Sequence, residues 1–467
     1  MTRTRTKAIV AVSLVSALTV AGGLAYIGTR VTPHAVAEPA PLLAGVSVPG
    51  ITTALIPDHP ALRIRVLGTD NGPVDTLAGQ FLSDVLDFWD TTEMPQGKGF
   101  FEPPHVAASF NSRTGKGASV CVDKDMVNAA ACRKRSGQTS IEWDRGELLP
   151  SLIASGNILS AGIVLAHETG HLVDFQLRDP KSFEEKRTIA QTLINEQRAD
   201  CYSGSWLAYV AEGTSRRFTA DPASVGETMR AILSFRDTNT VSGHGIGVER
   251  VNAAIRGFVA GPDVCAQIDR EFTVVNRQGI NLLGASTSHK RWEPLTEGDV
   301  QDIRDEVGMV TGTAPLISGD PCPDPDTTSA SATWCASRNE VSLDYAAFGA
   351  FSSDYPRVVG EMREGPGHRI GPLLAAMVQP YLTRNGVPST SGATSCAVGV
   401  VARALASPTH GELLDFGDLD EMLEETLTEG HSGTASDGSV EEWALNRAKD
   451  FLDGLYRVQS VEGCLGR

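Results

Sequence analysis

The sequence predicts an α+β fold: a mainly helical domain with a small sheet, followed by a second, degenerate copy of the same unit. Three observations support this prediction. Hydrophobic residues make up 41% of the 467 residues, enough to bury a core in each of two or three domains. Short segments with the alternation of strands precede longer segments with helical periodicity. One spacing of cysteines occurs twice along the chain.

The elements of the first copy follow from the spacing of its apolar residues. Alternation of apolar residues predicts strands, and recurrence every three or four positions predicts helices. Asp179-Pro180 ends the first long helix, since proline cannot continue it. The expected elements, in order, are a strand at 62–66, a helix at 77–88, strands near 106–110 and 141–143, and helices at about 160–179 and 189–213.

The first 45 residues predict an export segment and a linker. Basic residues precede an uncharged, mainly apolar stretch at residues 8–28, and Arg30 follows it, which directs the rest of the chain across a membrane. The stretch is long enough to span a bilayer, whereas Ala-Val-Ala at 35–37 fits a cleavage site. We therefore expect an extracytoplasmic protein held in the membrane by this helix, with cleavage and secretion as the alternative.

The charge of the chain excludes one class of partner. It carries 40 Lys and Arg against 57 Asp and Glu, a formal net charge of −17. Such a surface repels the phosphate backbone, so we expect no nucleic-acid partner.

The eight cysteines predict disulfides in an oxidising compartment. Eight cysteines permit about 105 pairings, and spacing chooses among them. A pair enclosing 10 or 12 residues is followed, in each half, by a pair enclosing 63 or 67. Only one pairing gives both halves the same two bridges: Cys121 with Cys132, Cys201 with Cys265, Cys322 with Cys335, and Cys396 with Cys464. The alternative for Cys201 is a metal ligand.

The cysteine pattern extends to its surroundings, which indicates an internal repeat. Strand-like segments at 140–144 and 340–344 follow Cys132 and Cys335 respectively, and a glycine lies three residues after both Cys201 and Cys396. Coincidental spacing is the alternative reading. The repeat predicts two domains after residue 45, at 46–277 and 278–467.

The strongest chemical signal is a His-Glu-x-x-His motif in the first copy. His167 and His171 lie in an apolar helical context, one turn apart on one face, so their ring nitrogens can share one ion. Glu168 projects beside the open position of that ion, where a carboxylate can take a proton from water. This arrangement is typical of zinc hydrolases.

The next helix offers a third ligand. Glu196 and Asp200 are four residues apart and share a helix face. Glu196 can complete a zinc site that leaves the fourth position to water, while Asp200 orients a histidine from outside the ligand set. The alternative is a solvated acidic face.

With these motifs the sequence resembles the bacterial putative neutral zinc metallopeptidases, which share the His-Glu-x-x-His and Glu-x-x-x-Asp pattern of gluzincins. The resemblance covers about residues 77–265 and includes the run Glu-x-x-Ala-Asp-Cys at 196–201. It implies a zincin-like catalytic domain and Zn²⁺ as the cofactor. His167, His171 and Glu196 would then be the zinc ligands, with Glu168 as the catalytic base.

The chain departs from this family at two positions. Leu172 and Asp174 stand where members commonly have a further His and then Gln.

Other candidates are weaker. His244 could stabilise a transition state, but a similar Gly-His run at 430–433 in the other copy favours a structural role, such as capping a helix. In the second copy, Ala376, Met377 and Pro380 occupy the positions of the two histidines and the glutamate, and Pro380 would end or kink that helix. We therefore expect a metal in the first copy alone.

These features predict an exported zinc-dependent peptidase. Its partner would be a peptide or protein substrate, whose identity the sequence leaves open. The alternative is a non-catalytic envelope protein that uses two peptidase-like modules as a binding scaffold.

Overall fold

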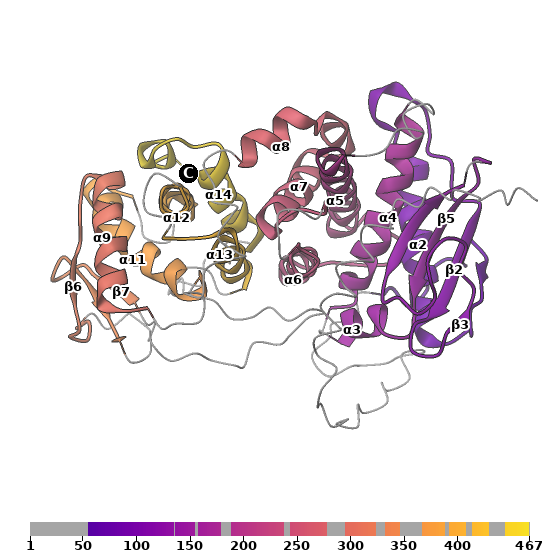
Figure 1. Ribbon diagram of the computed structural model, residues 1–467, viewed down its shortest axis with the longest axis horizontal. Coiled ribbons are helices and arrows are strands. Elements are labelled where there is room, and N and C mark those ends of the chain that lie inside the picture. Colours follow the sequence, from indigo (N-terminus) through magenta and orange to yellow (C-terminus); the bar gives the residue numbers. More distant parts are fainter. Residues whose placement is uncertain are drawn as a thin grey trace, which may run out of the picture. The chain divides into compact units, whose positions relative to one another are not determined.

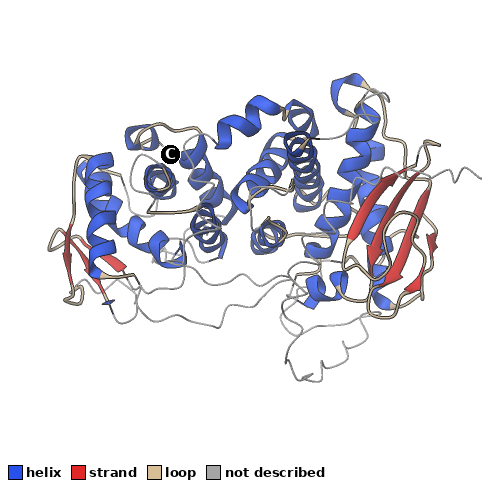
Figure 2. Cartoon of the chain, in the orientation of Figure 1, coloured by secondary structure: helices blue, strands red, loops and turns tan. Residues whose placement is uncertain are grey.

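The protein is mixed α and β, mainly helical, with two small sheets (Figures 1 and 2). The computed structural model describes residues 55–134, 136–154, 157–178, 188–237, 243–277, 295–323, 332–345, 367–387, 392–407, 413–428 and 444–466. The predicted export segment at 8–28 and the Ala-Val-Ala at 35–37 lie outside these residues. Within them, no helix is long and apolar enough to cross a membrane.

The chain divides into two compact units. Unit 1 contains Met1–Ser224, Val241–His244 and Ala253–Asp269; unit 2 contains Val225–Thr240, Gly245–Asn252 and Arg270–Arg467. The predicted division at residue 277 differs from this one, because residues 225–240, 245–252 and 270–277 group with unit 2.

Hydrogen bonds within unit 2 account for part of that grouping. The Asp420 carboxylate accepts hydrogen bonds from the backbone N–H groups of Gly247 (3.0 Å) and Val248 (2.7 Å). It also forms an ion pair with Arg236 at 3.1 Å. These contacts join segments far apart in sequence, which local periodicity does not report.

Unit 1 contains a sheet in the order β1-β2-β5-β4, with β3 paired to β2. Strands β1, β2 and β5 are parallel, and β4 is antiparallel to β5. Among the described strands, β4 is therefore an edge. The strands are β1 (Val66–Leu67), β2 (Val106–Asn111), β3 (Lys116–Gly117), β4 (Ala129–Arg133) and β5 (Thr139–Asp144).

The strand predicted at 62–66 is reduced to its last residue. Leu62 is exposed, and the backbone N–H of Arg63 donates to the Ser83 hydroxyl instead of to a neighbouring strand. Only Val66 of that segment pairs with β2.

Three long helices form the core of unit 1. Thr188 caps α5 by accepting a hydrogen bond from the Gln191 N–H (3.2 Å). Helices α4 and α5 pack against each other, and α2 packs on α4. The helices of this part of the chain are α2 (Pro73–Thr91), α3 (Leu148–Ala154), α4 (Leu159–Leu177), α5 (Ile189–Ala211), α6 (Pro222–Ser234) and α7 (Gly247–Ala260), with short 3₁₀ helices η2 (Pro95–Gly97) and η4 (Pro262–Gln267).

Unit 2 has a three-stranded sheet in the order β6-β8-β7, in which β6 and β8 are parallel and β7 is antiparallel to β8. The helix at 297–311 starts with a capping box of Thr296 and Asp299. The remaining elements are α8 (Arg270–Arg277), α9 (Glu297–Thr311), β6 (Leu316–Ser318), β7 (Ala332–Cys335), β8 (Glu340–Leu343), α11 (Gly367–Arg384), α12 (Gly392–Leu405), α13 (Phe416–Thr428), α14 (Ala444–Tyr456) and η7 (Val461–Cys464).

Helix α11 differs from the expectation that Pro380 could end it. It contains Pro372 and Pro380 and continues to Arg384, so Pro380 does not end the helix. Packing of its buried residues Met377 and Leu382 outweighs the loss of one backbone hydrogen bond at the proline.

The structure contains four disulfides, in the pairing that the cysteine spacing predicts. They join Cys121 to Cys132, Cys201 to Cys265, Cys322 to Cys335 and Cys396 to Cys464. Cys201 is thus a half-cystine and not a free thiolate ligand. Four disulfides are consistent with an extracytoplasmic protein, since they persist in oxidising compartments.

Candidate metal centre

Helix α4 presents both histidines of the motif on one face. His167 and His171 lie one turn apart, with ring centroids separated by 4.7 Å and planes nearly perpendicular. Both residues are largely buried, at 9% and 4% exposure. Burying two imidazoles costs solvation free energy unless their nitrogens find partners, so the surroundings of these rings decide their role.

Helix α5 supplies a carboxylate to both rings. One Glu196 oxygen lies 3.3 Å from Nε2 of His167, and the other lies 3.6 Å from Nε2 of His171. One donor atom from each of the three residues lies within 4.8 Å of the others. Two imidazole nitrogens and one carboxylate oxygen form the kind of three-residue donor set that catalytic zinc sites use. The predicted ligands are therefore brought together, and their donors fit a zinc ion.

Asp200 lies behind His167, as predicted. Its carboxylate is 2.7 Å from Nδ1 of His167, and 1% of the residue is exposed. When Nδ1–H donates to that carboxylate, the lone pair of Nε2 faces Glu196 and the candidate ion position. Nδ1 of His171 is buried and has no hydrogen-bond partner within the described part of the chain.

The charges in the site are strongly coupled. Burial lowers the pKa of His167, but the carboxylates of Asp200 and Glu196 outweigh burial and raise that pKa to about 10. Burial raises the pKa of Glu196, but His171, His167 and His244 outweigh it and hold that pKa well below its usual value. Without a metal, the cluster therefore holds a proton where a cation could bind.

Glu168 contacts the edge strand of the sheet. Its carboxylate accepts a hydrogen bond from the backbone N–H of Ala131 on β4, at 2.7 Å. The side chain is half-buried, next in sequence to His167 and less enclosed than the ligand residues. This contact was not expected, because the alanine run at 129–131 shows neither alternation nor β-branched residues that would mark a strand.

His244 lies within electrostatic reach of the centre. Its positive charge helps to lower the pKa of Glu196. Its neighbour Gly243 packs against Thr192, one turn before Glu196 on α5. The counterpart proposed for it at 430–433 lies outside the described residues.

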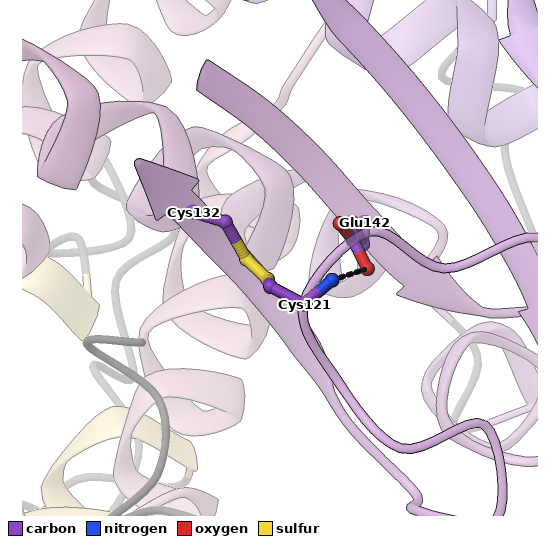
Figure 3. Close-up of side chains that lie close together, drawn as sticks. All are labelled: Cys121, Cys132 and Glu142. Carbon is purple, nitrogen blue, oxygen red and sulfur yellow. Dashed lines mark hydrogen bonds between the residues drawn. A yellow bond between two sulfur atoms is a disulfide. The ribbon is translucent and has the colours of Figure 1, made fainter. Parts of the chain in front are cut away.

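A second group of possible metal ligands stabilises a loop instead of forming a metal site. Cys121, Cys132 and Glu142 lie close together, but the two sulfurs are joined in a disulfide (Figure 3). Glu142 is fully buried and accepts hydrogen bonds from the N–H of Val120 (2.9 Å) and the hydroxyl of Ser140 (2.9 Å). The disulfide and this carboxylate fasten the loop before β4 to the sheet.

Comparison with known protein families, with curated proteins and with solved structures finds no match to this chain.

Proposed function

We propose that the chain is an extracytoplasmic zinc-dependent peptidase, with unit 1 as the catalytic unit. The observation that carries this proposal is the convergence of His167, His171 and Glu196, with Glu168 next to His167 on α4 and hydrogen-bonded to the edge strand β4. The four disulfides support the location. Anchoring by residues 8–28 stays a prediction.

The proposed chemistry assigns one task to each side chain. His167, His171 and Glu196 would hold Zn²⁺, which when bound supplies Lewis-acid activation of a carbonyl and of water. Glu168 takes the proton of the attacking water and delivers it to the leaving amine. Asp200 keeps His167 in the required tautomer.

A peptide substrate suits the surroundings of Glu168. The Ala131 N–H donates to Glu168 and not to β5, so the outer edge of β4 faces the catalytic carboxylate. An extended peptide can add to such an edge through main-chain hydrogen bonds. That docking would carry a scissile bond past Glu168.

We also propose that unit 2 is a diverged copy of unit 1. In both sheets a central strand has a parallel neighbour on one side and a cysteine-bearing antiparallel neighbour on the other. Cys132 pairs with Ser140 on β5, and Cys335 pairs with Glu340 on β8. Ser140 and Glu340 are the first residues of the two segments, 140–144 and 340–344, that the repeat aligns. A one-residue shift in register would have broken this agreement.

The helix pairs support the same alignment. In unit 1, a Cβ at Gly170 would lie 2.9 Å from the Cα of Ala199. In unit 2, Gln379 donates to the Thr394 hydroxyl at 3.2 Å. If these two contacts correspond, Ala376, Met377 and Pro380 align with His167, Glu168 and His171.

Hydrolysis by a Glu168→Gln variant tests the proposal. The variant should retain zinc and lose at least about 100-fold in kcat on a denatured protein substrate, because it lacks the general base. Glu102→Gln, an exposed glutamate of the same unit, is the matched control and should keep wild-type activity.

Two outcomes would reject the proposal. A wild type that binds no zinc would remove the metal centre. Full activity in Glu168→Gln would remove the assigned base. Zinc binding without hydrolysis in the wild type would favour the scaffold alternative.

A further inference from the structure

One carboxylate at the helix interface is not used in the proposed chemistry. Asp174 lies on α4 one turn beyond His171, and 1% of it is exposed. Residues three and four apart share a helix face, so Asp174 continues the face that carries His167 and His171. Its position on that face directs it, like the histidines, toward α5.

On α5, Asp174 meets Arg198. Nη1 of Arg198 lies 3.0 Å from the Asp174 carboxylate. The same guanidinium donates through Nε to the carbonyl of Ile268 (2.7 Å) and through Nη2 to that of Ala266 (3.3 Å). These carbonyls come one and three residues after Cys265, so Arg198 joins α4, α5 and the disulfide-bonded segment at one point.

A second arginine completes the connection. Arg178, the residue after the end of α4, forms an ion pair with the other oxygen of Asp174 and contacts the side-chain oxygen of Asn195. Asn195 directly precedes Glu196, and Arg198 lies two residues after Glu196. The Asp174 carboxylate is therefore linked to α5 on both sides of the candidate zinc ligand.

The geometry of this network resists movement of one helix along the other. The side chains of Asp174, Arg178 and Arg198 are 1%, 14% and 19% exposed, so water screens their charges weakly. A guanidinium is planar and directs its N–H groups along fixed axes, so a shift of α5 would break several charge-assisted hydrogen bonds together.

We propose that Asp174 is a positioning residue for the metal centre: through Arg198 and Arg178 it fixes Glu196 opposite the two histidines. The inference rests on the proposed function, because it assigns Asp174 a role toward the ion. Ligand sets must be held within about 0.5 Å of their productive geometry. Loosening α5 would therefore weaken metal binding although every ligand is still present.

The test compares Asp174→Asn and Arg198→Gln with a matched control. Asp84→Asn is that control, because Asp84 is also a fully buried carboxylate of unit 1 and also contacts α5, through Trp206 (2.8 Å). The readouts are Zn²⁺ affinity, measured by competition with a chromophoric chelator, and the visible absorption spectrum of the Co²⁺-substituted protein.

We expect Asp174→Asn and Arg198→Gln each to lower Zn²⁺ affinity about 10-fold or more and to change the Co²⁺ spectrum. The double variant should lose little more than Asp174→Asn alone, because that change already weakens the connection to Arg198. Asp84→Asn should lower stability and leave Zn²⁺ affinity and the spectrum unchanged. Arg198→Gln leaves Asp174 paired with Arg178, so it tests the inference even if Asp174→Asn does not fold.

Unchanged Zn²⁺ affinity and an unchanged Co²⁺ spectrum in the folded variants, with tight binding by the wild type, would overturn this inference alone. Equal loss of affinity in Asp84→Asn would also overturn it, since any buried carboxylate would then have the same effect. A wild type without zinc binding would overturn the proposed function as well.

Discussion

The two helix pairs, α4 with α5 and α11 with α12, differ most in the side chains that face each other. In unit 1 the interface holds two imidazoles and three carboxylates, and Asp200 directly precedes the half-cystine Cys201. In unit 2 the residue before the half-cystine Cys396 is Ser395, and Met377 is buried on α11. In both units a long disulfide joins the second helix of the pair to a short 3₁₀ helix, α5 to η4 and α12 to η7.

This difference distinguishes the side chains needed to pack the two helices from those that form the candidate metal site. Apolar, hydroxyl and amide side chains pack the helix pair in unit 2, so the packing of such a pair does not require buried histidines and carboxylates. Burying those groups in unit 1 costs solvation free energy that only partners or an ion can offset. Their presence in unit 1 therefore supports the proposed metal centre.

The largest effect is expected from removal of the third ligand. Glu196→Ala should lower Zn²⁺ affinity by at least about 1,000-fold, beyond the about 10–100-fold that outer partners contribute, because two histidines alone form an incomplete site. Titration with a chelator of known affinity measures this change. If the variant bound Zn²⁺ as tightly as the wild type, Glu196 would not be a ligand, and the alternative of a solvated acidic helix face would be favoured.

A smaller effect is expected at Asp200, and the comparison supplies its control. Asp200→Ala should cost about 10–100-fold in Zn²⁺ affinity, because His167 loses the carboxylate that orients it. Ser395→Ala, at the corresponding position of unit 2, should leave Zn²⁺ affinity unchanged. The same titration measures both variants, and equal losses in both would contradict the assignment of the metal to unit 1.

The pH dependence follows from the proton on His167. Burial lowers the pKa of His167, but Asp200 and Glu196 raise it overall to about 10 from 6.5. This proton stabilises the metal-free fold fully below pH 6.5, and the contribution is lost as the pH rises toward 10. Because Zn²⁺ must displace the proton, its apparent affinity should rise about tenfold per pH unit within this window.

Binding titrations at several pH values measure that slope. Asp200→Ala should flatten it, because the variant lacks the strongest of the groups that raise the pKa of His167. A wild-type affinity that does not change with pH would contradict the proton assignment.

The smallest effect on metal binding is expected from the long disulfides. Replacing Cys201 and Cys265 by Ala should cost about 4 kcal/mol of stability in the loop-entropy model and should also weaken Zn²⁺ binding, because the bridge begins beside Asp200. Replacing Cys396 and Cys464 should cost a similar amount without changing Zn²⁺ affinity. Thermal unfolding and chelator titration on both double variants compare the two bridges. Weaker Zn²⁺ binding in the unit 2 variant would argue against a metal confined to unit 1.

The sequence was most informative where the relevant pattern is local. Helical spacing brought His167, His171, Glu196 and Asp200 to facing helices, since four-residue separations on regular helices determine which side chains share a face. Cysteine spacing indicated the pairing found in the structure, because two long and two short loops recur in the same order.

Features that depend on tertiary contacts could not be predicted from the sequence. Strand β4 is an alanine run without alternation, so its contact with Glu168 through Ala131 was not foreseen. The role of Arg198 could not be predicted from local spacing, because its partner Asp174 lies on another helix. Likewise, the grouping of residues 245–252 with unit 2 depends on Asp420, far along the chain.

The zinc content of the purified full-length protein tests the central claim most directly. Elemental mass spectrometry, after equilibration with Zn²⁺ and removal of the excess, gives the number of tightly bound ions per chain. The account predicts one, held in unit 1 by His167, His171 and Glu196 and lost in His167→Ala. A content of zero, a content of two, or one ion that persists in His167→Ala would contradict it.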